Sequence, residues 1–406
     1  MSNKFRLLLF LVVVWVILLM LNVMIVYIDY DTLPLKTFSS VEYSHKYCVI
    51  YNYWESQKEY SEGPHITLVL HATSGYLSHL KDQLTTWTGG ISVSVFIPSP
   101  HNQSESVVKV LKNQLYLRSI FSALSSPEGT ELRNSGQISL HLFFQNRYFR
   151  TCPEFQNMYS ILGASLSDIK DFGDIVEVYP INVARNIARK EVRTALFVSG
   201  DIEQFYVRNF EARMYELAKR ILIEFVGLFN SYNNVFRGKK KTVLVYRRFE
   251  LQHSAPIPRN KAELKQLIAE KKAVEFHARY YSVGHHIRTY TDGWKPRNTS
   301  KKHASSMRSL QKRGFVGDER VPFHDERFPY RYRTNVQLGL HLCFKNFSFS
   351  VVSDLFSMHR GILEEQPLKI SFIKALVEKM KPYVIRKIFR KDLAATYPEM
   401  AKVCPL

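Results

Sequence analysis

Two carboxylates directly follow an apolar segment in the middle of the chain. Residues 194–199 (TALFVS) read as a buried strand, and after Gly200 the chain presents Asp201 and Glu203. Alternate side chains of an extended segment point the same way, so we expect these two carboxylates to converge. Paired carboxylates suit a hard divalent cation such as Mn2+ or Mg2+, whereas two solvated acids are the alternative interpretation.

A polar helix face precedes this strand. Residues 181–189 (INVARNIAR) read as a helix. The side chains at i, i+3, i+4 and i+7 share one face, and they are Asn182, Arg185, Asn186 and Arg189. Amide and guanidinium groups there can bind phosphate or sugar hydroxyls, whereas a plain solvent-exposed face is the alternative. Asparagine is a poor helix former, so its use twice on one face favours a binding role.

A histidine near the C-terminus is a candidate third ligand of the same ion. Residues 347–356 read as a strand that runs into residues 357–361 (SMHRG). An imidazole that follows a strand can join carboxylates on Mn2+, so we include His359 in the predicted metal site. A structural role is the alternative, and it is the commoner one for a single histidine.

The elements that must position these groups alternate between strand and helix. Strands are predicted at 65–70, 91–97, 138–144, 175–179 and 242–246, and helices at 77–87, 105–119, 210–229 and 261–271. This alternation predicts a sheet with crossover helices, an α/β domain of doubly wound type. Ligands of such sheets bind outside the carboxyl ends of the strands. His71 and Ala72, in the turn predicted after the first strand, are therefore candidate cofactor-binding residues.

The N-terminus carries a predicted membrane anchor. Residues 7–28 are almost all apolar, with Asn22 the one strongly polar side chain and no charge. At about 1.5 Å per residue this segment spans a bilayer core of about 30 Å. Lys4 and Arg6 precede it, so the tail is expected in the cytosol and the rest of the chain across the membrane. A cleaved signal peptide is the alternative, but the segment is too long and no small-x-small site follows it.

The predicted organisation has a cytosolic tail at 1–6, a transmembrane signal anchor at 7–28, a stem at 29–63 and a lumenal domain at 64–406. The cysteine count is even, as expected in an oxidising compartment, and leaves three pairings open among Cys48, Cys152, Cys343 and Cys404. Three N-x-S/T sequons occur, at Asn102, Asn298 and Asn346. Asn346 lies in a segment that reads as strand, so we expect no glycan there.

The formal net charge of the chain is +20. In a cytosolic protein this excess would suggest nucleic acid as a partner, but a lumenal location argues against it. The remaining anionic partners are nucleotide-sugars, acidic glycans and lipid headgroups. A solvated basic surface is the alternative.

Five parts of the chain together resemble glycosyltransferase family 49, which contains β-1,4-glucuronyltransferase and the second catalytic domain of LARGE-type enzymes. They are residues 84–96 (LTTWTGGISVSVF), 179–189 (YPINVARNIAR), 197–203 (FVSGDIE), 258–277 (PRNKAELKQLIAEKKAVEFH), and 325–328 (DERF) with 358–360 (MHR). The resemblance implies a GT-A-type (Rossmann-like) fold, a UDP-sugar donor, Mn2+ and inversion at the anomeric carbon. Together with the predicted anchor, this leads us to expect a Golgi membrane protein with a single pass, type II orientation and a lumenal catalytic domain.

The resemblance also assigns roles to residues. Asp201 and Glu203 stand at the family's D-x-D position and His359 at its later metal-binding histidine, although Glu203 departs from the second Asp. Arg185 would assist at the departing nucleoside diphosphate, whose charge a divalent cation stabilises.

Inversion requires a general base that accepts the proton of the acceptor hydroxyl. The resemblance places Asp325 and Glu326 near the acceptor, so they are the candidate bases, with Asp292 as an outside choice. Pairing with Arg327 or Arg331 is the alternative role.

Glucuronate is the first candidate for the transferred sugar, and a glycan on a glycoprotein or glycolipid is the expected acceptor. The expected protein partners are a second copy of the chain, in a homodimer, or a partner transferase. Two other function classes stay open: a membrane-anchored glycan-binding protein with an inactive transferase fold, and a basic scaffold for acidic glycans.

Overall fold

The computed structural model describes residues 37–57, 66–98, 120, 123–146, 151–156, 178–221, 241–279, 314–330, 332–364, 375 and 377–404. The predicted anchor at 7–28, the predicted helix at 105–119, the sequons at Asn102 and Asn298, and Asp292 lie outside these residues. Among the residues described, no helix has both the length and the hydropathy needed to cross a membrane.

The core of the structure is one mixed sheet with the strand order β2-β3-β6-β5-β4-β8-β12-β10-β13-β9, and β11 pairs with β10. The strands are β1 (Thr37–Ser39), β2 (Val41–Tyr43), β3 (Tyr47–Trp54), β4 (Ile66–Thr73), β5 (Ile91–Phe96), β6 (Ile138–Gln145), β7 (Glu154–Gln156), β8 (Leu196–Ser199), β9 (Gln204–Tyr206), β10 (Thr242–Leu251), β11 (Ala273–Glu275), β12 (Phe315–Asp318) and β13 (Ser348–Arg360). Strands β6, β5, β4 and β8 are parallel, and β10 is parallel to β13. The other pairs are antiparallel. The predicted α/β class is confirmed, but the doubly wound parallel sheet is correct only for the central strands.

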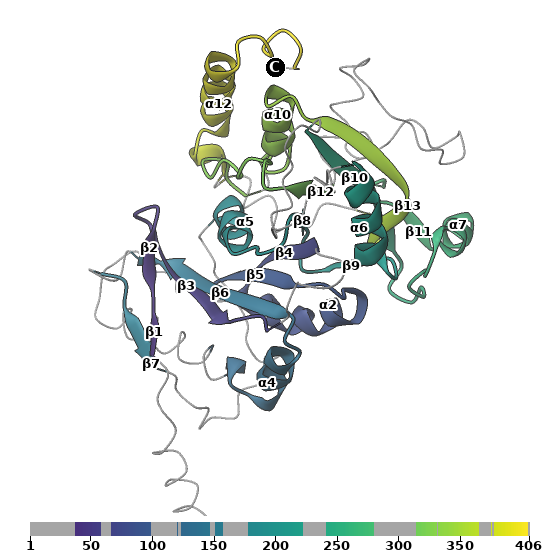
Figure 1. Cartoon of the computed structure of the whole chain (residues 1–406), viewed down its shortest axis with the longest axis horizontal. Helices are drawn as coiled ribbons and strands as arrows, with labels where there is room; N and C mark the ends of the chain where they lie inside the picture. Colours follow the sequence, from purple (N-terminus) through teal and green to yellow (C-terminus); the bar gives the residue numbers. More distant parts are fainter. Residues whose placement is uncertain are drawn as a thin grey trace, which may run out of the picture.

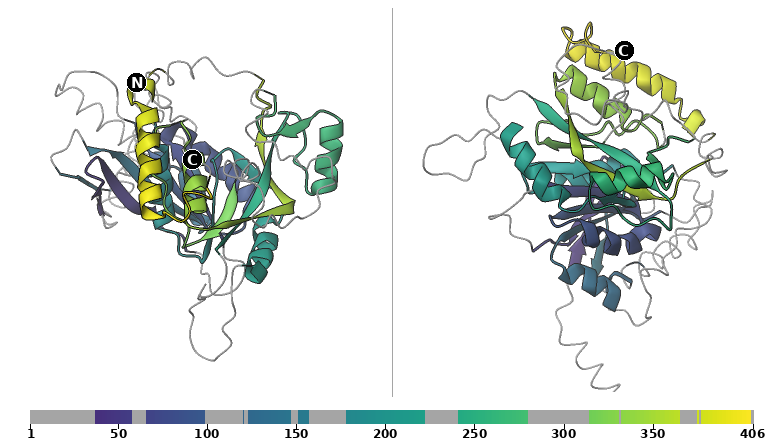
Figure 2. Two further views of the ribbon diagram at one scale, coloured as in Figure 1. Left: turned by 90° about the horizontal axis from the view of Figure 1, so that it is seen from above. Right: turned by 90° about the vertical axis from the view of Figure 1, so that its right-hand side faces the viewer.

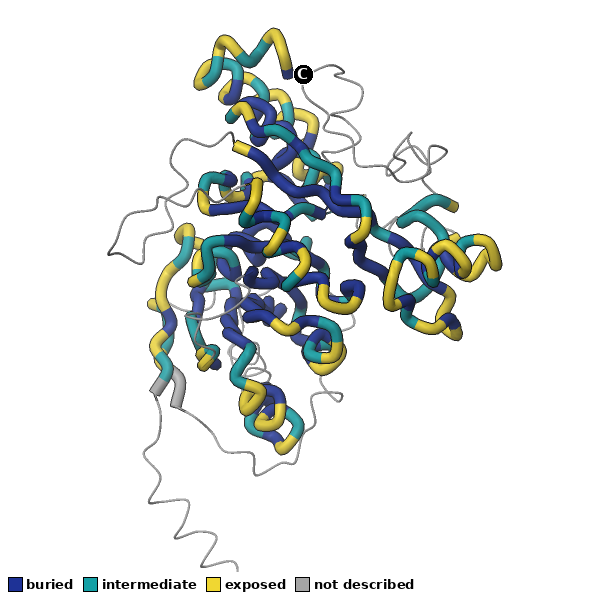
Figure 3. Tube along the Cα trace, turned by 45° about the vertical axis from the view of Figure 1, so that its right-hand side comes forward, coloured by how far each residue is buried: buried dark blue, intermediate teal, exposed yellow. Residues whose placement is uncertain are grey.

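Helices cover both faces of the central strands. The helices of the described residues are η1 (Ser74–His79), α2 (Leu80–Thr86), α4 (Pro127–Asn134), α5 (Ile181–Lys190), α6 (Phe210–Ile221), α7 (Lys261–Ala269), α10 (Val336–Phe344) and α12 (Pro382–Thr396). Figure 1 shows α5 and α2 on opposite sides of β4 and β5. Because both faces are covered, these strands are apolar along their length, and Figure 3 shows them as the buried centre of the molecule.

The chain before residue 64 is not only a stem. Strands β2 and β3 belong to the main sheet, because β3 pairs antiparallel with β6 along Tyr47–Trp54. Cys48 is fully buried and forms a disulfide with Cys152. The predicted stem boundary is therefore wrong for residues 41–54, whose strands β2 and β3 form one edge of the sheet.

The C-terminal part packs as a helical pair held by the second disulfide. Figure 2 shows α12 beside α10 at one end of the molecule. Phe344 of α10 packs with Phe389 and Leu393 of α12, and Cys343 is bonded to Cys404.

Asn346 lies in an exposed turn with φ near +60°, because β13 begins only at Ser348. The predicted strand at Asn346 is therefore wrong, and with it the reason to doubt a glycan there.

His141 gives the fold a testable acid sensitivity. It is fully buried in β6, where Nδ1 accepts from the Asn52 backbone N–H at 3.0 Å and Nε2 lies 3.1 Å from Ser92 Oγ. Burial, with the charge of Arg193, lowers the pKa of His141 to about 3. Only the unfolded state therefore binds this proton between pH 3 and 6.5.

We expect the free energy of unfolding to fall by up to about 1.4 kcal/mol per pH unit from this group as the pH drops below about 6.5. Urea unfolding of the wild type and His141→Gln across this range measures the effect. The variant should show a shallower pH slope, and an equal slope would mean that His141 is not held neutral.

Candidate active site

Asp201 lies at the carboxyl end of β8, one residue beyond Gly200. Because β4 and β8 are parallel neighbours, their carboxyl ends meet at one edge of the sheet, where ligands of α/β sheets bind. The chain turns after Asp201 instead of staying extended, since the Gln204 backbone N–H bonds to the Asp201 carbonyl oxygen at 3.0 Å. As a result, Asp201 and Glu203 contact different partners, and the extended geometry assumed from the sequence is wrong.

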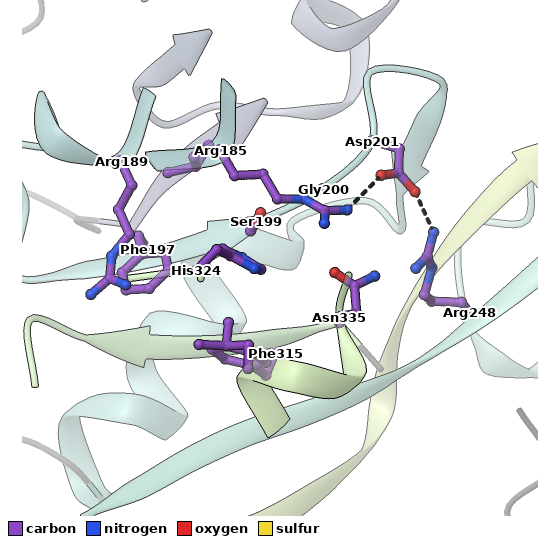
Figure 4. A pocket seen from close by; sticks show the side chains of 13 residues that line it. Arg185, Arg189, Phe197, Ser199, Gly200, Asp201, Arg248, Phe315, His324 and Asn335 are labelled. Atoms are coloured by element: carbon purple, nitrogen blue, oxygen red, sulfur yellow. Dashed lines mark hydrogen bonds and ion pairs between the residues drawn. The ribbon is translucent and has the colours of Figure 1, made fainter. Parts of the chain in front are cut away.

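Three basic side chains surround the Asp201 carboxylate. Arg248 Nη2 donates to Oδ2 at 2.8 Å, while His71 Nε2 and Arg185 Nη2 lie 3.3 and 3.6 Å from Oδ1. Figure 4 shows Arg185 and Arg248 reaching Asp201 from opposite sides. Desolvation alone would raise the pKa of Asp201, but the hydrogen bond from His71 and the guanidinium charges hold that pKa well below its ordinary value. Asp201 is therefore an ionised counter-ion shared by the two arginines.

His71 was predicted in a turn, but β4 continues to Thr73 and carries His71 inside the strand. Burial lowers its pKa, so the ring is neutral, and Nδ1 lies 3.0 Å from the Tyr179 hydroxyl. With Nδ1 accepting from Tyr179, Nε2 carries the proton toward Asp201. Ala72 is buried in the hydrophobic core, and its side chain does not line the pocket beside Asp201.

The pocket beside Asp201 is strongly basic. It opens to solvent at the carboxyl ends of β4 and β8. Among the described residues, its lining includes the guanidinium groups of Arg185, Arg189 and Arg248 and a single carboxylate, Asp201. Burial and the neighbouring arginines hold the pKa of His324, which also lines the pocket, well below its ordinary value. Three cations against one anion leave an uncompensated positive charge that suits an anionic ligand.

The polar face of α5 was predicted correctly, but most of it holds a loop. Asn182 Nδ2 donates to the Asp325 carbonyl oxygen at 2.8 Å, and Asn186 Nδ2 donates to the His324 carbonyl oxygen at 2.9 Å. Arg189 donates to the backbone carbonyls of residues 321 and 322. Asn182 and Asn186 are buried, so the alternative of a plain solvent-exposed face is wrong for them, and their role at a bound donor stays a prediction. Of this face, Arg185 is the side chain that contacts Asp201.

Glu203 and His359 form a separate pair. His359 Nε2 lies 3.5 Å from Glu203 Oε2. His359 lies within β13 instead of after a strand, because β13 extends to Arg360 alongside β10. Desolvation opposes protonation of His359, but the hydrogen bond and charge of Glu203 outweigh it and raise the pKa of the ring.

These contacts test the predicted metal ligands. Mn2+ or Mg2+ takes several oxygen ligands, which an imidazole can join on Mn2+. Both oxygens of Asp201 face basic groups, while Glu203 and His359 pair with each other. Within the described parts of the chain, no three His, Cys, Asp or Glu side chains are grouped to hold an ion. The side chains as arranged do not fit the predicted ion. The metal site therefore stays a prediction, and the reaction proposed below does not depend on it.

The two candidate general bases are engaged in contacts that hold the loop. Asp325 accepts from Arg327 through both oxygens, with the Arg327 Nη2 contact at 2.6 Å. Glu326 Oε1 accepts from the Tyr43 hydroxyl at 2.5 Å and from Asn186 Nδ2 at 2.8 Å. Neither residue lines the pocket. For Asp325 the observed contact is the pairing that the sequence left open, and the general-base role of both residues stays a prediction.

Arg248 is the site residue that the sequence patterns did not single out. It stands next to Arg247 in β10, a strand that is otherwise almost entirely buried. Two adjacent arginines inside an apolar strand were the available signal, because a buried guanidinium needs a partner. His324 and Asn335, which also line the pocket, lie on loops and gave no such signal.

Gly200 is required where β8 meets the site. A Cβ atom there would lie 2.6 Å from the Tyr206 hydroxyl oxygen, and Tyr206 is packed among Trp87, Phe210 and Tyr246. We expect Gly200→Ala to lower the free energy of unfolding by about 1–3 kcal/mol, measured in urea. Adding Tyr206→Phe removes the clashing oxygen and should restore most of the loss. Wild-type stability in the single variant would contradict the close approach.

Comparison with known proteins agrees with the resemblance seen in the sequence. The family profile described as "Glycosyl-transferase for dystroglycan" matches residues 65–398, most of the chain. The chain belongs to glycosyltransferase family 49. Family membership supports glycosyl transferase activity, so the pocket beside Asp201 is the candidate active site of a family 49 enzyme.

Curated relatives of this family 49 chain are β-1,4-glucuronyltransferases 1. The Mus musculus protein is 25% identical over 358 residues, which cover 84% of this chain and 77% of that protein. The Bos taurus and Homo sapiens proteins are 24% and 23% identical over 364 residues, with the same coverage.

Solved structures are similar only distantly. A crystal structure of GalNAc-T7 with UDP, GalNAc and Mn2+ has 12% identity and a TM-score of 0.38, with 82% of this chain and 55% of that chain covered. S. aureus TarS in complex with UDP has 6% identity and a TM-score of 0.35, with 78% and 65% covered. The chain thus spans about half to two thirds of these proteins.

Proposed function

We propose that this protein transfers a sugar, with glucuronate as the first candidate, from a UDP-sugar to a hydroxyl group of a glycan. The observation that carries the proposal is the basic pocket at the carboxyl ends of β4 and β8 in a family 49 chain. A UDP-sugar is anionic through its diphosphate, and UDP-glucuronate also through its sugar carboxylate. The names of the relatives favour glucuronate.

In the proposed reaction the bond between the anomeric carbon and the phosphate oxygen breaks, and the electron pair leaves with UDP. The acceptor hydroxyl attacks the opposite face of the sugar, and its proton passes to a general base. The residues of the pocket bind the anionic donor and stabilise the charge that grows on the leaving group.

The proposal includes a location and an acceptor class. The predicted anchor at 7–28 would hold the enzyme in the Golgi membrane as a type II protein with its catalytic domain in the lumen. The family description names dystroglycan, so glycans of glycoproteins are the first acceptors to test, followed by those of glycolipids.

The test uses the full chain, purified in detergent, with a panel of UDP-sugars and glycan acceptors. UDP release and the mass of the product glycan are measured, and Arg259→Gln, at an exposed arginine of the surface, serves as the matched control. We expect one donor, UDP-glucuronate first, to be consumed only with acceptor and the control to match the wild type within about twofold. Glycan binding without consumption of any donor would instead identify an inactive transferase fold.

A further inference from the structure

The positive charge around Asp201 exceeds the negative charge that the described residues place beside it. Arg185 and Arg248 share Asp201, the one carboxylate among the described lining residues, and the third arginine, Arg189, donates to backbone carbonyls. Buried guanidinium groups are costly unless paired, so a pocket with this excess is stabilised by an anion from outside.

The donor groups of the two arginines are not saturated by Asp201. The Arg185 contacts with Asn182 Oδ1 and Asp201 Oδ1 are 3.4 and 3.6 Å, longer than a usual charge-assisted bond of about 2.7–2.9 Å. Arg248 Nε is buried and has no hydrogen-bond partner among the residues that the structure describes, while its guanidinium carbon lies 4.3 Å from the centre of the Phe276 ring. Both side chains are at least nine-tenths buried and lie at the edge of the sheet where a ligand enters.

The same two arginines occupy the place expected for a metal ion. A cation bound to Asp201 would lie within a few ångströms of the Arg248 guanidinium, which already bonds Oδ2 at 2.8 Å, and would be repelled by it. On the other oxygen, a cation would displace the proton that His71 directs toward Asp201. The guanidinium groups of Arg185 and Arg248 thus provide fixed positive charge at the position where the sequence motif predicts a bound metal ion.

On the basis of the proposed function, we propose that Arg185 and Arg248 bind the donor diphosphate directly and supply the positive charge at the leaving group, with Asp201 as their internal counter-ion. Guanidinium groups bind phosphate oxygens in a bidentate manner, so the two arginines can hold two phosphate groups. Asp201 then orients the guanidiniums and does not ligate an ion. UDP binding should therefore persist in a chelator.

The experiment measures the dissociation constant of UDP by calorimetry on the full chain, with Mn2+ and with EDTA. We expect EDTA to change the constant by less than about threefold. Arg248→Gln and Arg185→Gln should each weaken UDP binding about 10- to 100-fold, with Arg248→Lys intermediate and Arg259→Gln unchanged. Equal melting temperatures of Arg248→Lys and the wild type ensure that the comparison is between folded proteins.

Two results would overturn the proposal while leaving the transferase function intact. One is UDP binding that is abolished by EDTA and unaffected by Arg248→Gln. This result would mean that a metal ion, and not the arginines, supplies the positive charge at the diphosphate. The other is an unchanged dissociation constant of UDP in Arg248→Gln together with a lost preference for UDP-glucuronate over UDP-glucose. This result would mean that the arginines bind the carboxylate of the sugar and not the diphosphate. No binding of UDP in any condition would overturn the proposal and the proposed function together.

Discussion

Replacing Asp201 with asparagine is expected to stop sugar transfer while UDP still binds. The amide cannot compensate the two guanidiniums that Asp201 holds at 2.8 and 3.6 Å, so they lose their fixed positions. A misplacement of about 1 Å at a reacting group costs about 100-fold in rate, and we expect at least that loss in kcat. UDP affinity should stay within about threefold, because the pocket keeps its arginines and loses a negative charge.

The same variant should be modestly less stable. Removing one partner of a buried ion pair costs about 3–5 kcal/mol, but 38% of the Asp201 side chain is exposed, so we expect about 1–3 kcal/mol. Steady-state kinetics, UDP calorimetry and urea unfolding separate the three effects. If Asp201→Asn lost UDP binding in parallel with activity, Asp201 would be acting as the ligand of a cation and not as the counter-ion of the two arginines.

Arg185→Gln is expected to lower kcat/KM by about 100- to 1,000-fold. Arg185 projects from α5 into the pocket and contacts Asp201, and a guanidinium aimed at a leaving phosphate acts mainly in the transition state. The fold should tolerate the change, because removing an under-compensated buried cation relieves desolvation. Initial rates at varied donor concentration measure this effect.

The matched comparison is Arg189→Gln, one turn further along the same helix. Arg189 donates to the backbone carbonyls of residues 321 and 322 and lies 4.3 Å from the centre of the Phe197 ring, so its loss should lower the melting temperature more than Arg185→Gln does. Activity loss without instability at Arg185, and instability at Arg189, would separate ligand binding from loop anchoring. Equal melting temperatures and equal initial rates in Arg185→Gln and Arg189→Gln would contradict these separate roles.

Local patterns predicted the parts of the site that depend on local structure. The apolar segment ending at Gly200 is strand β8 followed by Asp201, and the polar residues of α5 share one face as their spacing required. The family resemblance, carried by segments such as 197–203, was confirmed over residues 65–398.

Long-range contacts were not accessible from these patterns. The solvent interpretation of the α5 face failed because Asn182 and Asn186 bond a loop 138 to 143 residues away, and no local periodicity encodes that partner. Arg248 was overlooked for the same reason, since its partner Asp201 is 47 residues away, just beyond the end of β8. Strands β2 and β3 fell within the predicted stem because β6, the strand that joins β3 to the main sheet, lies far along the chain.

The most direct test of diphosphate binding by the two arginines is a crystal structure of the full chain with UDP, grown once with Mn2+ and once with EDTA. We predict that in both crystals the diphosphate lies in the pocket beside Asp201, within hydrogen-bond distance of the Arg185 and Arg248 guanidiniums. A diphosphate located elsewhere, or one held through an ion on Glu203 and His359 and missing from the EDTA crystal, would contradict this prediction.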